Sequence, residues 1–121
     1  MDINCDLGES LAFLQSGHDE ALMQYIHSAN IACGFHAGDA YIMAKTIENA
    51  LKYNLNIGAH PGFKDKENFG RTEIEMSLNE IEDLIGVQLE FIHKIAGRKL
   101  HHVKPHGALY NMAAKRTDYA L

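Results

Sequence analysis

The sequence predicts an α/β fold with a parallel sheet, in which four strand–helix units form about half of a (β/α) barrel. Segments typical of strands and helices alternate along the 121 residues in the order βαβαβαβα, which indicates a parallel sheet with right-handed crossovers. The strands have one apolar side and one polar side. Each strand also ends in a polar motif, as expected where an active site forms at the carboxyl ends of several strands.

Strands are expected at four places, residues 2–7, 28–33, 55–60 and about 100–105. In the first of them Ile3, Cys5 and Leu7 alternate with polar residues, and the next two strands show the same alternation. Successive side chains of a strand point to opposite faces, whereas strands buried on both faces are apolar throughout. The sequence therefore predicts helices on one face of the sheet and a polar cavity on the other.

Two helices are expected in the first half of the chain. Residues 19–26 form a short helix, for which Asp19 or Ser16 is available as N-cap. After the second strand, Asp39 can cap a longer helix that continues to Tyr53 and carries apolar residues on one face.

Two further helices are expected in the second half. Ser77 and Glu80 have the spacing of a capping box, which opens the longest helix, and Gly97 closes that helix. A last helix begins near Tyr110 or Thr117.

Composition excludes several classes of function. The net charge is −5 and no basic cluster is present, which argues against nucleic acid as a partner. No apolar run approaches the roughly 20 residues that span a membrane, and no signal pattern precedes the first strand, so a cytoplasmic location is expected. Without such a signal, Cys5 and Cys33 are expected to be reduced, and Cys33 to be a packing residue.

The motifs at the strand ends contain histidines and carboxylates that could bind a metal or take part in catalysis. Three of the eight histidines, His36, His60 and His106, fall there, and the other five are interpreted as surface or packing residues. Imidazoles together with carboxylates such as Asp6 and Glu9 suit zinc, manganese or a similar ion, which would activate a bound water. No HExxH pair is present, so histidines that only donate hydrogen bonds in a polar cavity are an alternative.

Acid–base chemistry without a metal is a second option. Asp6 could act as a general base, with one of the three histidines relaying protons and Lys104 stabilising an oxyanion. The alternative for Asp6 is a carboxylate bonded to turn amides. For Asp39, a helix cap is favoured over catalysis.

The remaining polar candidates are open to two interpretations. Asn4 and Asn30 either bind a ligand or satisfy backbone groups. Arg71 either clamps a carboxylate bidentately or is a surface residue. The fingerprints GxxxxGK[ST], GxGxxG and GxSxG are all absent, which counts against nucleotide binding by those devices and against a serine hydrolase.

Several segments together resemble a known family. They are NCDLGES at 4–10, SANIACGFHAGD at 28–39, GAHPG at 58–62, FGR at 69–71 and VKPHGALYN at 103–111. In this order and spacing they closely resemble the LamB/YcsF family over essentially the whole chain.

The resemblance implies a (β/α) barrel of the glycoside hydrolase/deacetylase type. It also implies the role of the A subunit in ATP-dependent 5-oxoprolinase, in which the lactam ring of 5-oxoproline is opened to L-glutamate and ATP is used with partner subunits B and C. Carried over to matching positions, the site comprises Asp6, Glu9, Asn30, His36, Asp39, His60, Arg71, Lys104 and His106.

Within that implied site, roles follow from the chemistry of amide opening. Asp6 or a bound metal would activate the water, and Lys104 or His106 would meet the oxyanion. His60 would protonate the leaving nitrogen, and Arg71 would hold the substrate carboxylate.

The chain differs from the family in length, because it has 121 residues whereas a full barrel usually needs about 200 residues or more. The chain is therefore expected to be the N-terminal half of such a barrel, and two copies could associate to complete one. Two other functions remain open, a metal-dependent deacetylase or amidohydrolase acting alone and a half-barrel without catalytic activity.

Overall fold

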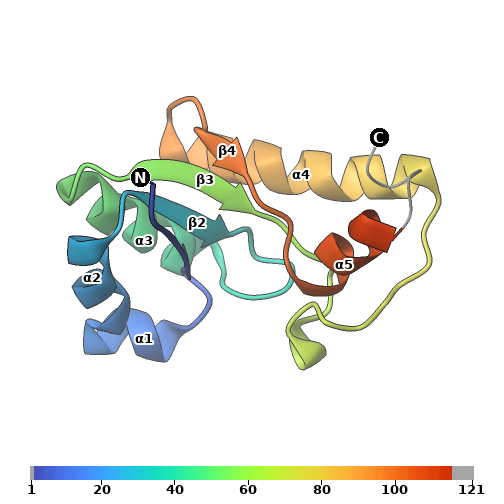
Figure 1. The fold of residues 1–121 in the computed structure, drawn as a ribbon, viewed down its shortest axis with the longest axis horizontal. Coiled ribbons are helices and arrows are strands. Elements are labelled where there is room, and N and C mark those ends of the chain that lie inside the picture. Colours follow the sequence, from blue (N-terminus) through green and yellow to red (C-terminus); the bar gives the residue numbers. More distant parts are fainter. Residues whose placement is uncertain (1, 116–121) are drawn as a thin grey trace.

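The computed structural model describes residues 2–115 and contains one parallel sheet with helices between the strands (Figure 1). The strands are β1 (Asn4–Leu7), β2 (Ser28–Ala32), β3 (Asn56–His60) and β4 (His102–Val103), in the spatial order β1-β2-β3-β4. The helices are α1 (Leu11–Ser16), α2 (His18–Leu22), α3 (Ala40–Lys52), α4 (Leu78–Ala96) and α5 (Gly107–Lys115), with 3₁₀ turns η1 (Met23–Tyr25) and η2 (Lys66–Asn68). The predicted α/β class and the parallel sheet are confirmed.

The register of the sheet sets polar residues in one row. Asp6 lies opposite Asn30, Asn30 lies opposite Gly58, and Gly58 lies opposite His102. Because parallel strands keep this register along their length, the residues that follow each strand also meet at the carboxyl end of the sheet. The sheet therefore positions the candidate site.

The fourth strand is shorter than expected, since only His102 and Val103 are in regular strand conformation. Parallel pairing nevertheless continues, because Lys104 N–H donates to Ala59 O at 2.8 Å and His106 N–H donates to Pro61 O at 2.8 Å. This pairing holds the segment after β4 alongside the end of β3.

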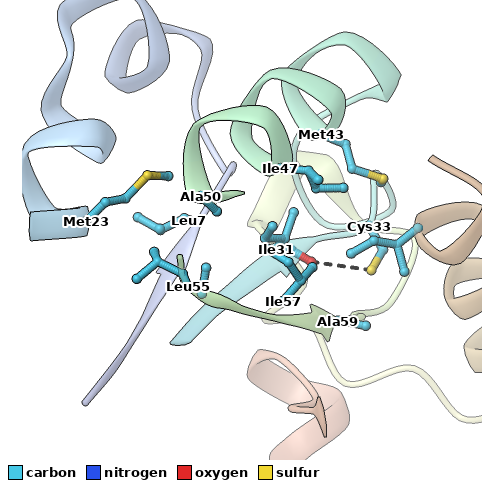
Figure 2. Packing of buried hydrophobic residues seen from close by; sticks show 12 residues of the cluster. Leu7, Met23, Ile31, Cys33, Met43, Ile47, Ala50, Leu55, Ile57 and Ala59 are labelled. Carbon is cyan, nitrogen blue, oxygen red and sulfur yellow. Dashed lines mark hydrogen bonds between the residues drawn. The ribbon is translucent and has the colours of Figure 1, made fainter. Parts of the chain in front are cut away.

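Helices cover the apolar face of the sheet, as the alternation predicts. Figure 2 shows side chains of β1, β2 and β3 packed against α3. The buried members of this core are Leu7, Met23, Ala29, Ile31, Cys33, Met43, Ile47, Ala50, Leu55, Ile57, Ala59 and Ile92. Ile3 is an exception to the expected alternation, because it precedes β1 and is exposed.

A second apolar cluster holds the loop after β3 against two helices. Its buried members are Phe63, Ile81, Leu84, Ala108, Leu109 and Met112, which come from that loop, α4 and α5. Gln88 of α4 adds a polar anchor, accepting from Gly62 N–H at 3.0 Å and donating to Gly62 O at 2.9 Å. The loop is thereby fixed beside the ends of the strands.

The region between β1 and β2 differs from the prediction. Helix α1, which Ser10 caps, was not expected, and none of its residues is buried, so it leaves no amphipathic pattern. The expected helix at 19–26 is α2 followed by η1, and Gly17 is its N-cap. Asp19 lies inside α2, where it is buried and accepts the Gly8 N–H at 3.1 Å.

The caps of the two long helices are confirmed. The Asp39 side chain accepts the Ile42 N–H at the start of α3. Ser77 and Glu80 form the capping box of α4, and Gly97 ends that helix in left-handed conformation.

The last described helix, α5, begins at Gly107, three residues before the expected Tyr110. The alternative start at Thr117 lies outside residues 2–115. Within that range, no helix combines the length and hydrophobicity needed to cross a bilayer.

Candidate active site at the carboxyl ends of the strands

Four side chains converge where the strands end, and we call them the histidine cluster: Glu9, His36, His60 and His106. Glu9 follows β1, His36 follows β2, His60 ends β3 and His106 follows β4. One ligand atom of each lies within 4.8 Å of the others. The three histidines are buried and Glu9 is half-buried. The predicted convergence of these strand ends is therefore present in the fold.

Backbone carbonyls orient two of the histidines. His60 Nδ1 donates to Lys104 O, and His106 Nε2 donates to Phe69 O at 2.7 Å. Because a carbonyl only accepts, these nitrogens carry the protons. In the neutral rings the other nitrogens, His60 Nε2 and His106 Nδ1, hold lone pairs that face each other at 3.0 Å. Two facing lone pairs repel, so this arrangement calls for a shared proton or a bound cation.

The third histidine holds the carboxylate of the cluster. His36 Nε2 lies 2.8 Å from Glu9 Oε2, and because a carboxylate accepts, Nε2 carries the proton. Its Nδ1 is buried and has no hydrogen-bond partner among residues 2–115. The His36 ring stacks on the His106 ring, with centroids 3.8 Å apart.

Glycines allow the loops to close tightly over the cluster. A Cβ at Gly70, whose φ is +69°, would lie 2.6 Å from His36 Cβ and 3.1 Å from His106 Cδ2. A Cβ at Gly62 would lie 2.8 Å from His36 Nδ1. Neither glycine was predicted as a site residue, because the chain segments that they contact are distant in sequence.

Burial shifts the titration of the cluster. Burial lowers the pKa of His60, and the opposing effects of Asp6, the Lys104 carbonyl and Glu9 do not restore it. Burial and the neighbouring His36 lower the pKa of His106 in the same way. Both imidazoles are therefore neutral near pH 7.

A second group of side chains, which we call the polar network, lies on the inner face of the sheet: Asn4, Asp6, Asn30, His102 and Lys104. Lys104 Nζ donates to Asp6 Oδ1 at 2.9 Å. The Asn30 amide donates to Asp6 Oδ1 at 3.1 Å and to Asn4 Oδ1 at 2.8 Å. The His102 Nε2–H donates to Asn30 Oδ1. The network thus fixes one orientation of the Asp6 carboxylate.

The polar network keeps Asp6 ionised. Burial raises the pKa of Asp6, but the hydrogen bond from Lys104, the nearby His60 and the Asn30 amide outweigh burial, so the pKa lies below its usual range. Asp6 Oδ2 also lies 3.5 Å from His60 Nε2. Asp6 therefore connects the polar network to the histidine cluster.

His102 corrects the sequence interpretation, which placed it among surface or packing residues. The polar side of the fourth strand contains His102, Lys104 and His106, and this alternation was the signal that could have identified it. To reach Asn30, His102 crosses β3 at Gly58, where an added Cβ would lie 2.1 Å from its Nε2. A glycine at this position therefore makes room for the contact.

Two candidates stand apart from these groups. The Asp39 side chain is exposed and serves as the cap of α3. The exposed Arg71 guanidinium lies over the Phe69 ring, 5.4 Å from its centroid. Phe69 in turn contacts both His36 and His106 edge-on, so Arg71 reaches the rim of the histidine cluster.

Two clefts open beside the cluster. One, of about 190 Å³, is lined by Asp6, His60, Lys104, Pro105, His106, Gly107, Tyr110 and Asn111. The other, of about 180 Å³, is lined by Asp6, Glu9, Ser10, Phe13, His18, Asp19, Leu22 and Phe69. Both are smaller than the 300–1,000 Å³ or so of drug-sized pockets, which suits a small ligand. Imidazole nitrogens and a carboxylate oxygen are also donors that hold divalent metals.

Comparison with known proteins places the chain in a family. The model of the LamB/YcsF family matches residues 1–121, the whole chain. The chain belongs to the LamB/YcsF family. This agrees with the segments at the strand ends that resemble that family.

Relatives of this LamB/YcsF chain have names that refer to 5-oxoprolinase and to lactam utilization. It is 49% identical over 123 residues to a Bacillus cereus protein that is named as the A subunit of 5-oxoprolinase, and 50% identical to a Bacillus cytotoxicus protein of the same name. The crystal structure of the lactam utilization protein from Thermus thermophilus matches with a TM-score of 0.90 and 39% identity.

This LamB/YcsF chain spans about half the length of the relatives that it matches. The Bacillus alignments cover 99% of this chain and 49% of the relative. The Thermus structure covers 99% of this chain and is itself covered over 50% of its length.

Proposed function

We propose that this chain is part of the A subunit of an ATP-dependent 5-oxoprolinase, which hydrolyses the lactam of 5-oxoproline to L-glutamate. The observation that carries the proposal is the convergence of Glu9, His36, His60 and His106 beside the Asp6–Lys104 pair. The names of the relatives, which refer to 5-oxoprolinase and to lactam utilization, support the same reaction.

Asp6 and Lys104 supply the first two requirements of lactam opening, an activated water and a stabilised oxyanion. The lowered pKa of Asp6 keeps its carboxylate ionised and able to accept a proton from water. Lys104 lines the same 190 Å³ cleft, where its ammonium group would face the oxygen that becomes negative.

His60 supplies the third requirement, a proton for the leaving nitrogen. Its Nε2 holds a lone pair 3.5 Å from Asp6 Oδ2. The proton that Asp6 takes from water would pass to His60 Nε2 and then to the ring nitrogen as the C–N bond breaks. Water thus provides the hydroxyl of the new carboxyl group and the proton of the new amine. His106 lies against His60 Nε2 and would stabilise the protonated ring.

Substrate binding is proposed for residues that surround these groups. Arg71 at the rim would hold the carboxylate of 5-oxoproline, and the clefts would accept its small ring. Asn4 and Asn30 act through Asp6, since both of them belong to its hydrogen-bond network. Asp39, which the family resemblance places in the site, is proposed to act as a helix cap instead of contacting substrate.

A divalent cation is compatible with the same site. Glu9 together with histidines of the cluster would hold it, and it would supply polarisation of a bound water or carbonyl. ATP is proposed to act through partner subunits B and C, because the chain contains none of the nucleotide fingerprints named above.

The architecture that we propose for the whole protein is a (β/α) barrel of the glycoside hydrolase/deacetylase type, of which this chain is the first half. The strands follow one another in space without reversal, as in a barrel and unlike a doubly wound sheet. The remaining strands would come from the rest of the longer protein or from a second copy.

The test is an assay of glutamate release from 5-oxoproline by the full-length protein containing this chain. We expect release only when ATP and subunits B and C are present. Absence of release from the complete, folded mixture would reject the substrate. Release by the protein alone without ATP would favour the second candidate, a metal-dependent amidohydrolase, which the histidine cluster makes chemically reasonable.

A further inference from the structure

We propose that Glu9, His60 and His106 form a three-ligand site for a divalent transition-metal ion such as zinc, and that His36 positions Glu9 without binding the metal. This inference deepens the proposed function by assigning a cofactor to its site, and it rests on that function only for the use of the metal. A metal on His60 Nε2 would replace that nitrogen as proton carrier, and Asp6 would then pass the proton of water to the leaving nitrogen itself. Binding itself can be measured without any turnover.

The three ligand atoms have separations that suit one ion. His60 Nε2 lies 3.0 Å from His106 Nδ1, and Glu9 Oε2 lies 3.7 Å from each of these nitrogens. A point about 2 Å from all three atoms exists in such a triangle, and zinc bonds to imidazole nitrogen and carboxylate oxygen are about 2.0–2.2 Å long. The side chains therefore need little movement to bind.

The outer nitrogens of the two histidine ligands are held as in metal sites. Metal-binding histidines almost always donate their other N–H to a carbonyl, carboxylate or water, which fixes the tautomer. His60 donates to Lys104 O and His106 donates to Phe69 O. The two lone pairs that remain belong to nitrogens 3.0 Å apart, and a cation bound between them would relieve their mutual repulsion.

His36 does not share this arrangement. Its Nδ1 is buried without a hydrogen-bond partner among residues 2–115. His36 therefore lacks the hydrogen bond that orients the rings of His60 and His106. Its Nε2–H donates to Glu9 Oε2, and its ring is fixed by stacking on His106. His36 therefore sets the direction of the Glu9 carboxylate, the usual task of a residue just outside the ligands of a metal.

The surroundings admit a small cation and leave it accessible. Asp6 Oδ2 lies 3.5 Å from His60 Nε2 and adds negative charge, which Lys104 partly offsets. The 190 Å³ cleft reaches both His60 and His106. A metal bound there would keep a position open for water or substrate, as catalytic sites with three protein ligands do.

The experiment is calorimetric titration of the purified full-length protein containing this chain with Zn²⁺, supported by the visible spectrum with Co²⁺. We expect one ion per chain. The variants H60Q, H106Q and E9Q should each bind at least about 100-fold more weakly, and H36Q should lose about 10-fold, as removal of an outer residue does. The matched control is H93Q in α4, which should bind like the wild type, since His93 is exposed.

Folding is controlled by circular dichroism of every variant. Where a variant unfolds, nitrogen NMR of the wild-type histidines replaces it, and Zn²⁺ should move the signals of His60 Nε2 and His106 Nδ1 while leaving His36 Nδ1 in place.

Millimolar or non-stoichiometric binding would overturn the site. A loss in H36Q equal to that in H60Q would overturn the ligand set. Glutamate release by metal-free enzyme would reject the assigned cofactor and leave the proposed function standing, whereas tight binding without any release would do the reverse.

Discussion

Lys104 Nζ lies 2.9 Å from Asp6 Oδ1, although the two residues belong to opposite edges of the sheet. Three strand spacings would separate the edges of a flat four-stranded sheet by roughly 14 Å, which is longer than a hydrogen-bonded lysine–aspartate pair can span. The sheet must therefore curl toward its polar face. This curl brings the ends of all four strands around one small volume.

The Asp6–Lys104 pair is expected to matter for catalysis. In the full-length protein with its partner subunits, D6N should lower kcat about 10²–10⁴-fold because the proposed general base is lost. K104M should lower kcat about 10²–10³-fold because the proposed cation for the oxyanion is lost. The measurement is steady-state glutamate release. K99M, at an exposed lysine, is the matched control, and equal activity of D6N and wild type would contradict the assigned role.

Gly58 and His102 are expected to be coupled. An added Cβ at Gly58 would lie 2.1 Å from His102 Nε2, so G58A should displace the imidazole and destabilise the fold by about 1–3 kcal/mol. In the H102A background the same substitution should cost less than about 1 kcal/mol, since the clash is gone. Urea unfolding of the four proteins measures this cycle, and strictly additive effects would show that the two residues do not meet.

Asp19 is expected to make stability depend on pH. Burial raises the pKa of this carboxyl above its usual 3.8, although the Gly8 N–H opposes the shift. The folded protein therefore binds the proton more tightly, and the contribution of Asp19 to stability is full below the unfolded pKa and is lost as the pH rises through the folded pKa.

The D19N variant tests this sign. Its amide oxygen can still accept the Gly8 N–H, so its stability relative to wild type should rise as the pH increases from about 4 through the raised pKa of Asp19. D19A removes the acceptor and should lose about 1–3 kcal/mol. Urea unfolding at several pH values gives both results, and a D19N difference that stays flat with pH would disprove the shift.

Cys33 is expected to be unreactive in the folded protein. Burial raises the pKa of its thiol to about 12, and the side chain lies in the core (Figure 2). Ellman's reagent should modify Cys33 only after denaturation. Rapid modification under native conditions, located by peptide mass spectrometry, would be incompatible with this packing.

Local sequence patterns predicted the features that depend only on residues close together in the chain. The alternation in the strands indicated which face of the sheet the helices cover, because the direction of each side chain follows from its position in its own strand. The cap residues Asp39, Ser77 and Gly97 were readable for the same reason. Helix α1 was missed because it buries no residue and therefore carries no apolar stripe.

Contacts between distant segments could not be predicted in this way. Gly62 and Gly70 matter because His36 lies against them, and no local pattern indicates that approach. The position of the His102 ring depends on Gly58, which is distant in sequence. Because Gly58 has no side chain, the His102 ring can cross β3 at that residue. The residues of the histidine cluster were predicted individually, but their tautomers depend on carbonyls of other loops.

We propose above all that the histidine cluster is the reactive centre of a lactam-opening enzyme. The most direct test of this proposal is ATP-coupled glutamate release from 5-oxoproline by the full-length protein with subunits B and C, comparing H60Q with H93Q. We expect H60Q to lose at least about 100-fold in kcat, because the substitution removes the ring nitrogen that either transfers the proton or holds the metal, while H93Q keeps wild-type activity. A folded H60Q variant that retains full activity would contradict the account.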